Sequence, residues 1–165
     1  MKPMKPAALR LIAFRVIPAL ALLLAVGAGV LKYLDHSQQA AQRAATESVD
    51  AARQTTAAIL SYRADTVDKD LNAARDRLTG TFLDSYTTLI NGTVIPGAKE
   101  KKISTDAKVP AAASVSATSN HAVVLAFVNQ TVTIGSGAPT TTPSSVRVTL
   151  DKVDGRWLVS GFDPV

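Results

Sequence analysis

The side chains that most often perform catalysis or bind metals are scarce in this sequence. It has no cysteine and only two histidines, His36 and His121. No third ligand lies at metal-binding spacing from either histidine, so we expect no metal site, and we expect both histidines to face solvent. Serine catalysis lacks a G-x-S-x-G elbow, and Gly135-Ser136-Gly137 falls in an expected loop.

Acid–base chemistry would need a carboxylate or a tyrosine whose pKa is tuned by burial. Tyr62, Asp84 and Tyr86 are the candidates, in a conical pocket. Tyr86, however, shares an apolar stripe with Phe82 and Leu89, which favours core packing. Nearly every acid is predicted to be exposed. The sequence therefore predicts no enzyme, no catalytic residue, no metal ligand and no cofactor or cofactor-binding residue.

Two further patterns have a structural and a functional interpretation. Trp157, the only tryptophan, is expected to anchor the core against Phe82 or Phe127, and its alternative role is a contact with a partner. The lysine-rich segment PGAKEKK at residues 96–102 is expected to be a solvated turn, and its alternative role is a contact with anionic lipid.

Positive charge is concentrated at the N-terminus. Residues 1–31 carry four of the 18 Lys and Arg residues and none of the 13 acids, so the rest of the chain is nearly neutral. Nucleic acid is therefore not an expected partner, because phosphate binding needs clustered cations on a folded surface. Residues 16–31 are uncharged, and residues 11–34 would form about 36 Å of helix, enough to cross a membrane.

A cleaved signal peptide is the alternative interpretation of this segment. The apolar run is longer than a usual signal peptide has, and no small-x-small cleavage site follows it. Four cations precede the run and one closely follows it, so the N-terminus is predicted to be cytoplasmic. We expect a single-pass cell-membrane protein with a cytoplasmic basic tail (1–10), a transmembrane helix in membrane lipid (11–34), a helical stalk (35–64) and an exported, extracytoplasmic domain (65–165).

The exported domain begins with a helical pattern. Apolar residues recur with helical spacing from Val67 to Leu78, and a second stripe follows Gly80, which indicates a break near that glycine. Asn91-Gly92 is expected to end the helical region. The stalk before it is rich in Ala and Gln, and only its last turn has large apolar side chains for docking.

After the helices, the apolar period changes to that of strands. Strands are predicted over residues 109–117 and 121–134, then over 146–153 and the segment RWLVSGF, which follows an Asp154-Gly155 hairpin turn. Residues 135–145 are expected to be a mobile loop. Helices followed by about four antiparallel strands indicate an α+β domain with the helices on one sheet face.

Several segments carry a resemblance to a known family. They are Leu60-Ser61-Tyr62, LTGTF at residues 78–82, VVLAFVNQ at 123–130 and VTLDKVDGRWLV at 148–159. Over residues 10–163 the order and spacing of these segments resemble the Mce-associated membrane proteins, accessory subunits of mammalian-cell-entry lipid transporters of actinobacteria.

The resemblance implies a fold, a function and a set of partners. The implied fold is a cone like that of nuclear transport factor two, with helices on a curved sheet, which a type IV secretion scaffold shares. The implied function is non-enzymatic: the protein would stabilise or assemble a lipid importer in the cell envelope through contacts with other transporter subunits. Two alternatives stay open, a membrane-tethered ligand-binding or enzymatic domain and a type IV secretion-like scaffold subunit.

Overall fold

The structure is a computed structural model that describes residues 39–165. The predicted cytoplasmic tail, the predicted span at residues 11–34 and His36 lie outside this range. Between residues 39 and 165, no helix is both long and apolar enough to cross a membrane. Residues Ala41–Val165 form one compact unit, which contains the sheet and the helices that cover it.

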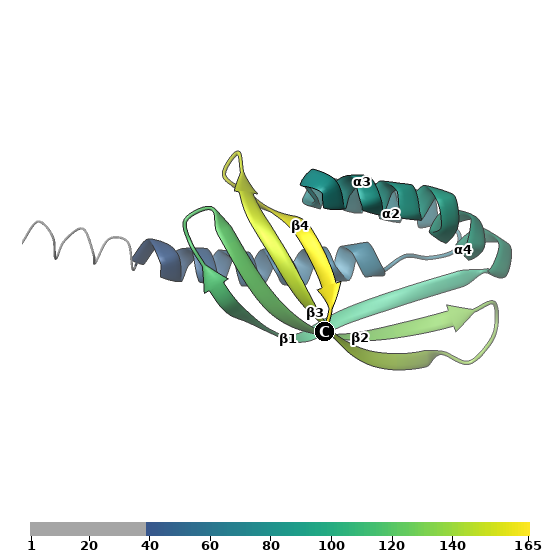
Figure 1. Ribbon diagram of the computed structural model, residues 1–165. Helices are drawn as coiled ribbons and strands as arrows, with labels where there is room; N and C mark the ends of the chain where they lie inside the picture. Colours follow the sequence, from purple (N-terminus) through teal and green to yellow (C-terminus); the bar gives the residue numbers. More distant parts are fainter. Residues whose placement is uncertain (1–38) are drawn as a thin grey trace, which may run out of the picture. The chain divides into compact units, whose positions relative to one another are not determined.

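Four antiparallel strands form a single sheet in the order β1-β2-β3-β4 (Figure 1). They are β1 (Ile103–Ala117), β2 (His121–Ile134), β3 (Thr140–Val153) and β4 (Arg156–Pro164). The strands curve strongly around the helices. This arrangement confirms the predicted α+β architecture of helices on a four-stranded antiparallel sheet.

The sequence-based strand boundaries were only partly right. The hairpin turn at Asp154-Gly155 is confirmed, and both residues have positive φ, 50° and 77°. The predicted loop over residues 135–145 was wrong from Thr140 onward, where β3 begins and pairs with the end of β2. Threonine suits a pleated strand, and Thr131 and Thr141 hydroxyls lie 2.8 Å apart across the pair.

The helical region contains a break and a longer continuation than expected. Helix α2 (Val67–Ala74) leads through a 3₁₀ turn to α3 (Gly80–Leu89), which confirms the break near Gly80. The predicted stop at Asn91-Gly92 was wrong, because a π-helical turn carries the chain into α4 (Ile95–Lys101).

The expected turn at residues 96–102 was also wrong, because it lies mostly in α4. Pro96 lies in the first turn of that helix, where its missing N–H is not needed. The helix ends at Lys102, whose backbone is left-handed with φ 52°.

The helix over residues 39–60 lies behind the strands in Figure 1 and packs on the inner face of the sheet. The sequence predicted that only its last turn docks, but burial begins one turn into the compact unit. The buried side chains are mostly small: Ala44, Ser48, Ala52, Thr55, Thr56 and Ile59. Small side chains give a weak apolar pattern in sequence, yet they let a helix approach a sheet closely.

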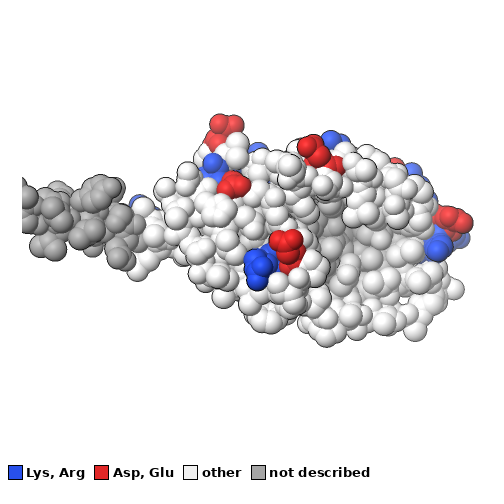
Figure 2. All heavy atoms as spheres, in the orientation of Figure 1, with Lys and Arg blue, Asp and Glu red and all other residues white. Residues whose placement is uncertain are grey.

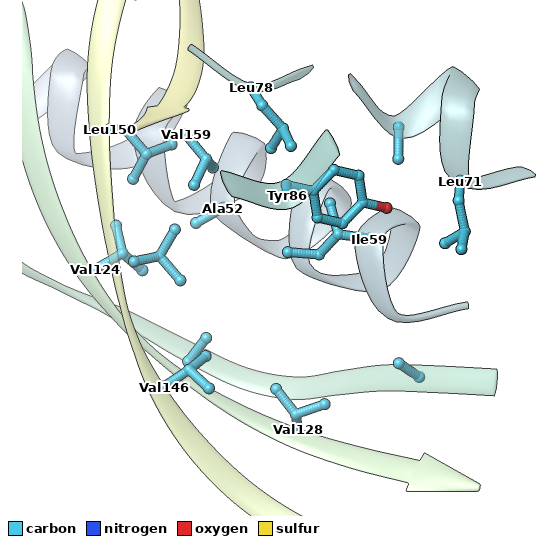
Figure 3. Close-up of a cluster of buried hydrophobic side chains, with 14 of the residues drawn as sticks. Ala52, Ile59, Leu71, Leu78, Tyr86, Val124, Val128, Val146, Leu150 and Val159 are labelled. Atoms are coloured by element: carbon cyan, nitrogen blue, oxygen red, sulfur yellow. The ribbon is translucent and has the colours of Figure 1, made fainter. Parts of the chain in front are cut away.

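The core lies between this helix, the sheet and the helices α2 and α3. Figure 3 shows side chains from all three converging: Ala52 and Ile59 from the helix, Val124, Val128, Val146, Leu150 and Val159 from the sheet, and Leu71, Leu78 and Tyr86 from the α2–α3 region. Leu78 also forms a parallel bridge to Val159, so the break between α2 and α3 is held against β4.

Candidate functional site

His121 lies at the start of β2, directly opposite Asp151 of β3. Its Nδ1 is 2.7 Å from the Asp151 carboxylate, and both side chains are substantially exposed. Hydrogen bonds with Ser160 and His121 hold the pKa of the Asp151 carboxyl below its ordinary value. The Asp151 carboxylate is thus hydrogen-bonded to both the serine and the histidine. In the described part of the chain no set of three metal-binding side chains gathers.

Tyr86 and Asp84 lie on different sides of α3. Tyr86 is buried in the core, and burial raises the pKa of its hydroxyl strongly. That hydroxyl has no hydrogen-bond partner among the described residues, and in Figure 3 it points toward Leu71, away from the sheet. Asp84 is exposed. The structure therefore does not bring this tyrosine and this carboxylate together.

Tyr62 lines an open hollow of about 810 Å³. The end of the first helix, α2, the start of β1 and the end of β2 surround it. Burial raises the pKa of its hydroxyl. Asp70 also lines the hollow, but its carboxylate accepts hydrogen bonds from the Thr66 hydroxyl at 2.6 Å and the Arg63 N–H at 3.2 Å. Asp106 is exposed at the rim. The carboxylate beside the tyrosine thus stabilises the start of α2.

Trp157 is buried on the inner side of β4, but neither predicted partner contacts it in a ring pair. Phe82 stacks on Phe162 with ring centroids 6.1 Å apart, and Phe127 is 49% exposed. Instead the Trp157 indole N–H donates to the Glu47 carboxylate at 3.1 Å. This burial supports the prediction of a core position, while no ring pair joins Trp157 to either phenylalanine among the described residues.

Glu47 joins two elements that are far apart in sequence. Its carboxylate also accepts a hydrogen bond from the Lys152 ammonium at 2.9 Å, and that ammonium lies 5.3 Å from the centre of the Trp157 ring. These hydrogen bonds hold the pKa of Glu47 below its ordinary value. The cluster pins the first helix to the β3–β4 hairpin.

The lysine-rich segment lies in and just after α4, at the opposite end of the compact unit from residue 41 (Figure 1). Lys99 forms an ion pair with Asp68 of α2 at 2.5 Å, and both side chains are about half exposed. The segment therefore lies far from the end of the compact unit where the first helix begins.

The outer face of the sheet carries apolar side chains that no described element covers. On β2 it presents Val123, Leu125 and Phe127, and Phe127 is 49% exposed. Ala113 and Ala111 on β1 lie directly opposite Leu125 and Phe127. Figure 2 shows a broad uncharged area over the strands with only isolated charged groups. We call these five residues the outer patch.

Charged residues border the outer patch on the β3 and β4 side. Arg147 lies opposite Leu125 on one flank and opposite Asp163 on the other. A central apolar area with a polar border is the usual anatomy of a protein–protein interface.

The chain matches the family described as Rv1363c/MT1408-like uncharacterized protein over residues 10–164, and it belongs to that family. It is 58% identical over 156 residues to outer membrane protein Rv1973 of Mycobacterium tuberculosis, covering 94% of this chain and 98% of that protein. It is 44% identical over 154 residues to uncharacterized protein Rv1362c of the same species, covering 91% of this chain and 70% of that protein.

Several solved structures share this fold at low sequence identity. An IcmL-like type IV secretion system protein of Legionella pneumophila has a TM-score of 0.61 at 7% identity, covering 71% of this chain and 88% of that one. The periplasmic domain of DotI has a TM-score of 0.61 at 16% identity, covering 71% and 91%. VirB8 of Agrobacterium tumefaciens has a TM-score of 0.57 at 14% identity, covering 70% and 88%.

Sequence reasoning missed both the outer patch and the Glu47–Trp157 contact. Phe127 was considered only as a core neighbour of Trp157. The alternation of β2 contained the signal, because Phe127 shares its parity with His121 and Asn129, two polar residues. No local signal could have paired Glu47 with Trp157, since the two are separated by most of the domain.

Proposed function

We propose that this protein is a non-enzymatic scaffold subunit of a multiprotein complex in the cell envelope. The fold carries the proposal: its solved neighbours include an IcmL-like type IV secretion system protein, DotI and VirB8. Because a fold does not fix a function, the outer patch adds separate support, since it presents apolar area without the paired reactive groups of an active site.

The identity of the complex is the finer part of the proposal. A type IV secretion-like assembly has the better support, because one of the fold neighbours is an IcmL-like type IV secretion system protein. An Mce-type lipid importer is the second candidate, on the sequence resemblance described above. In both, the protein stabilises its neighbours by binding, and its loss lowers their abundance.

Membrane attachment is also part of the proposal. We infer a single span at residues 11–34 with the N-terminus in the cytoplasm, because positive charge precedes the apolar run. A relative 58% identical to this chain is named an outer membrane protein, which supports an envelope location. An alkaline phosphatase fused to the C-terminus is expected to be active, whereas activity only of a cytoplasmic reporter would reverse the orientation.

The experiment that tests the scaffold function is affinity purification of the full chain from native membranes, with partners identified by mass. The wild-type protein is expected to retain other subunits of one envelope complex. Phe127→Asp places a charge in the outer patch and is expected to lose them. Leu89→Asp is the matched control, since Leu89 is 54% exposed at the end of α3 and is not part of the outer patch.

The identity of the retained proteins separates the two candidates. Secretion-type subunits would support the first assembly, and Mce-type transporter subunits the second. A protein recovered alone, or equal retention by Phe127→Asp and wild type, would contradict a scaffold role through the outer patch.

A further inference from the structure

The two edges of the sheet are closed to different extents. Residues 61–64 run beside the first part of β1, along the edge that faces away from β2, and seal this part of the edge with hydrogen bonds. Tyr62 and Thr105 exchange two backbone hydrogen bonds of 3.0 and 2.8 Å, and the Ala107 N–H donates to the Ser61 hydroxyl at 2.9 Å. Beyond Ala107 no hydrogen bond from another described element reaches this edge.

The unsealed part of β1 covers residues 111–117, which we call the free edge. Pro110 has no N–H to donate, and a register shift between Lys108 and Ala111 separates the free edge from the sealed part. Its side chains are small, and Val115 is 66% exposed. An open row of backbone N–H and C=O groups is a template for pairing with another strand.

Charge distinguishes this edge from the other. Natural sheets usually protect an open edge with lysine or another charged side chain. Residues 111–117 have no ionisable side chain, whereas β4 carries Arg156 and Asp163 and is bridged to Leu78 at Val159. The free edge of β1 therefore lacks the charges that would keep two copies apart.

We propose that the free edge of β1 pairs antiparallel with the free edge of a second copy of this chain, so that two sheets join into one. A two-fold axis through an uncharged segment brings no like charges together. The open backbone N–H and C=O groups of the segment in one copy pair with those of the same segment in the other copy. The joined sheets would also place two outer patches side by side on one continuous face. This inference does not rest on the proposed function, because a paired edge can serve any anchored domain.

Geometry makes the pairing testable by single cysteines, because the native chain has none. In a two-fold antiparallel pair, only the residue on the axis lies opposite its own copy. A residue two positions away is about 14 Å from its copy at 3.4 Å per residue. A disulfide needs Cα atoms within about 7 Å, so cross-linking must peak sharply along the strand.

The experiment oxidises the full chain in detergent, with copper-phenanthroline as the oxidant, in seven single-cysteine variants that cover the free edge from Ala111→Cys to Ala117→Cys. Ser85→Cys, an exposed serine on α3, is the control. One of the seven positions is expected to give about tenfold more disulfide-linked dimer than Ser85→Cys and than positions two residues away. Equal cross-linking at all positions, or none above the control, would overturn the proposal.

A second measurement does not depend on oxidation. Light scattering of the wild-type chain is expected to give the mass of two copies after correction for detergent. Val115→Lys adds like charges to the free edge and is expected to shift the mass to one copy, while Leu89→Lys leaves it at two. A wild-type monomer, or a dimer that survives Val115→Lys, would overturn the pairing, as would cross-links only to a different protein. The outer patch stays intact in Val115→Lys, so failure here is distinct from failure of the scaffold function.

Discussion

The two faces of the sheet differ in what covers them, although both carry apolar side chains. On the inner face of β2, Ala122, Val124, Ala126 and Val128 are fully buried under the helices. On the outer face the same strand presents Val123, Leu125 and Phe127, with no described element over them. Apolar content alone therefore does not distinguish the buried face of this sheet from its exposed face.

The difference lies in the side chains that surround each face. The inner face meets helices whose small and apolar side chains fill the space, and Glu47 clamps the first helix to Trp157. The outer patch is bordered instead by exposed charged residues on β3 and β4. The inner face should therefore determine stability and the outer face association, and the two can be separated by mutation.

The largest effect is expected for the two aromatic residues that represent the two faces. In a fragment of residues 41–165, Trp157→Ala removes a buried ring and a hydrogen bond and should lower the free energy of unfolding by about 3–5 kcal/mol. Phe127→Ala removes a half-exposed ring and should lower it by less than about 1 kcal/mol. Chemical denaturation of both variants measures the difference.

The reverse outcome would change the assignment of the faces. If Trp157→Ala left the unfolding midpoint unchanged and abolished partner binding, Trp157 would belong to an interface. If Phe127→Ala were as destabilising as Trp157→Ala, the outer patch would be part of a core.

Much of the sheet could be predicted from local sequence. The apolar residues of the segment 121–134 predicted a strand, and Asp154-Gly155 predicted the β3–β4 hairpin, because both signals depend on neighbouring residues only. The break near Gly80 was visible for the same reason, since the apolar stripe changes phase there and Gly80 has a positive φ of 60°.

Features that depend on tertiary contacts could not be predicted. The buried face of the first helix is made of alanine, serine and threonine, so its apolar pattern is too weak to reveal docking. The π-helical turn after Leu89 carries the chain past Asn91-Gly92. Ile90, before this pair, and Ile95, after it, are both buried in the core, which favours a continued helix. The candidate site depends on which face the helices cover, and that choice is also tertiary.

A smaller effect is expected for the clamp on the inner face. The folded-state pKa of Glu47 is lowered from 4.5 by its hydrogen bonds to Lys152 and Trp157, so its contribution is present above pH 4.5 and is lost as pH falls below it. Glu47→Gln should destabilise the fragment less than Trp157→Ala does at neutral pH. It should also flatten the acid limb of the stability curve.

Thermal unfolding between pH 7 and pH 3 tests this expectation. Asp50→Gln is a useful control, because Asp50 lies one turn further along the same helix and is also exposed. An acid limb that is equally steep in Glu47→Gln and wild type would show that the clamp does not link the helix to the hairpin.

A gain of stability is expected at Tyr86. Its hydroxyl is buried without a partner among the described residues, so Tyr86→Phe should raise the free energy of unfolding by about 1 kcal/mol at neutral pH. The raised folded-state pKa also means that stability falls as pH rises above 10, where the unfolded tyrosine ionises. Tyr86→Phe should lose less stability above pH 10 than wild type. A destabilised Tyr86→Phe would instead show that the hydroxyl has a partner.

The smallest effects are expected at the outer-face and surface groups that resemble catalytic residues. His121→Gln and Asp84→Asn replace exposed side chains, so each should change the free energy of unfolding by less than about 0.5 kcal/mol. Each should also leave retention of envelope partners unchanged, because a scaffold uses shape and not proton transfer. The measurement is affinity purification beside Phe127→Asp, which should lose the partners. If His121→Gln or Asp84→Asn kept the complex assembled but abolished transport by it, one of these groups would act chemically, and the division between a structural inner face and a binding outer face would be incomplete.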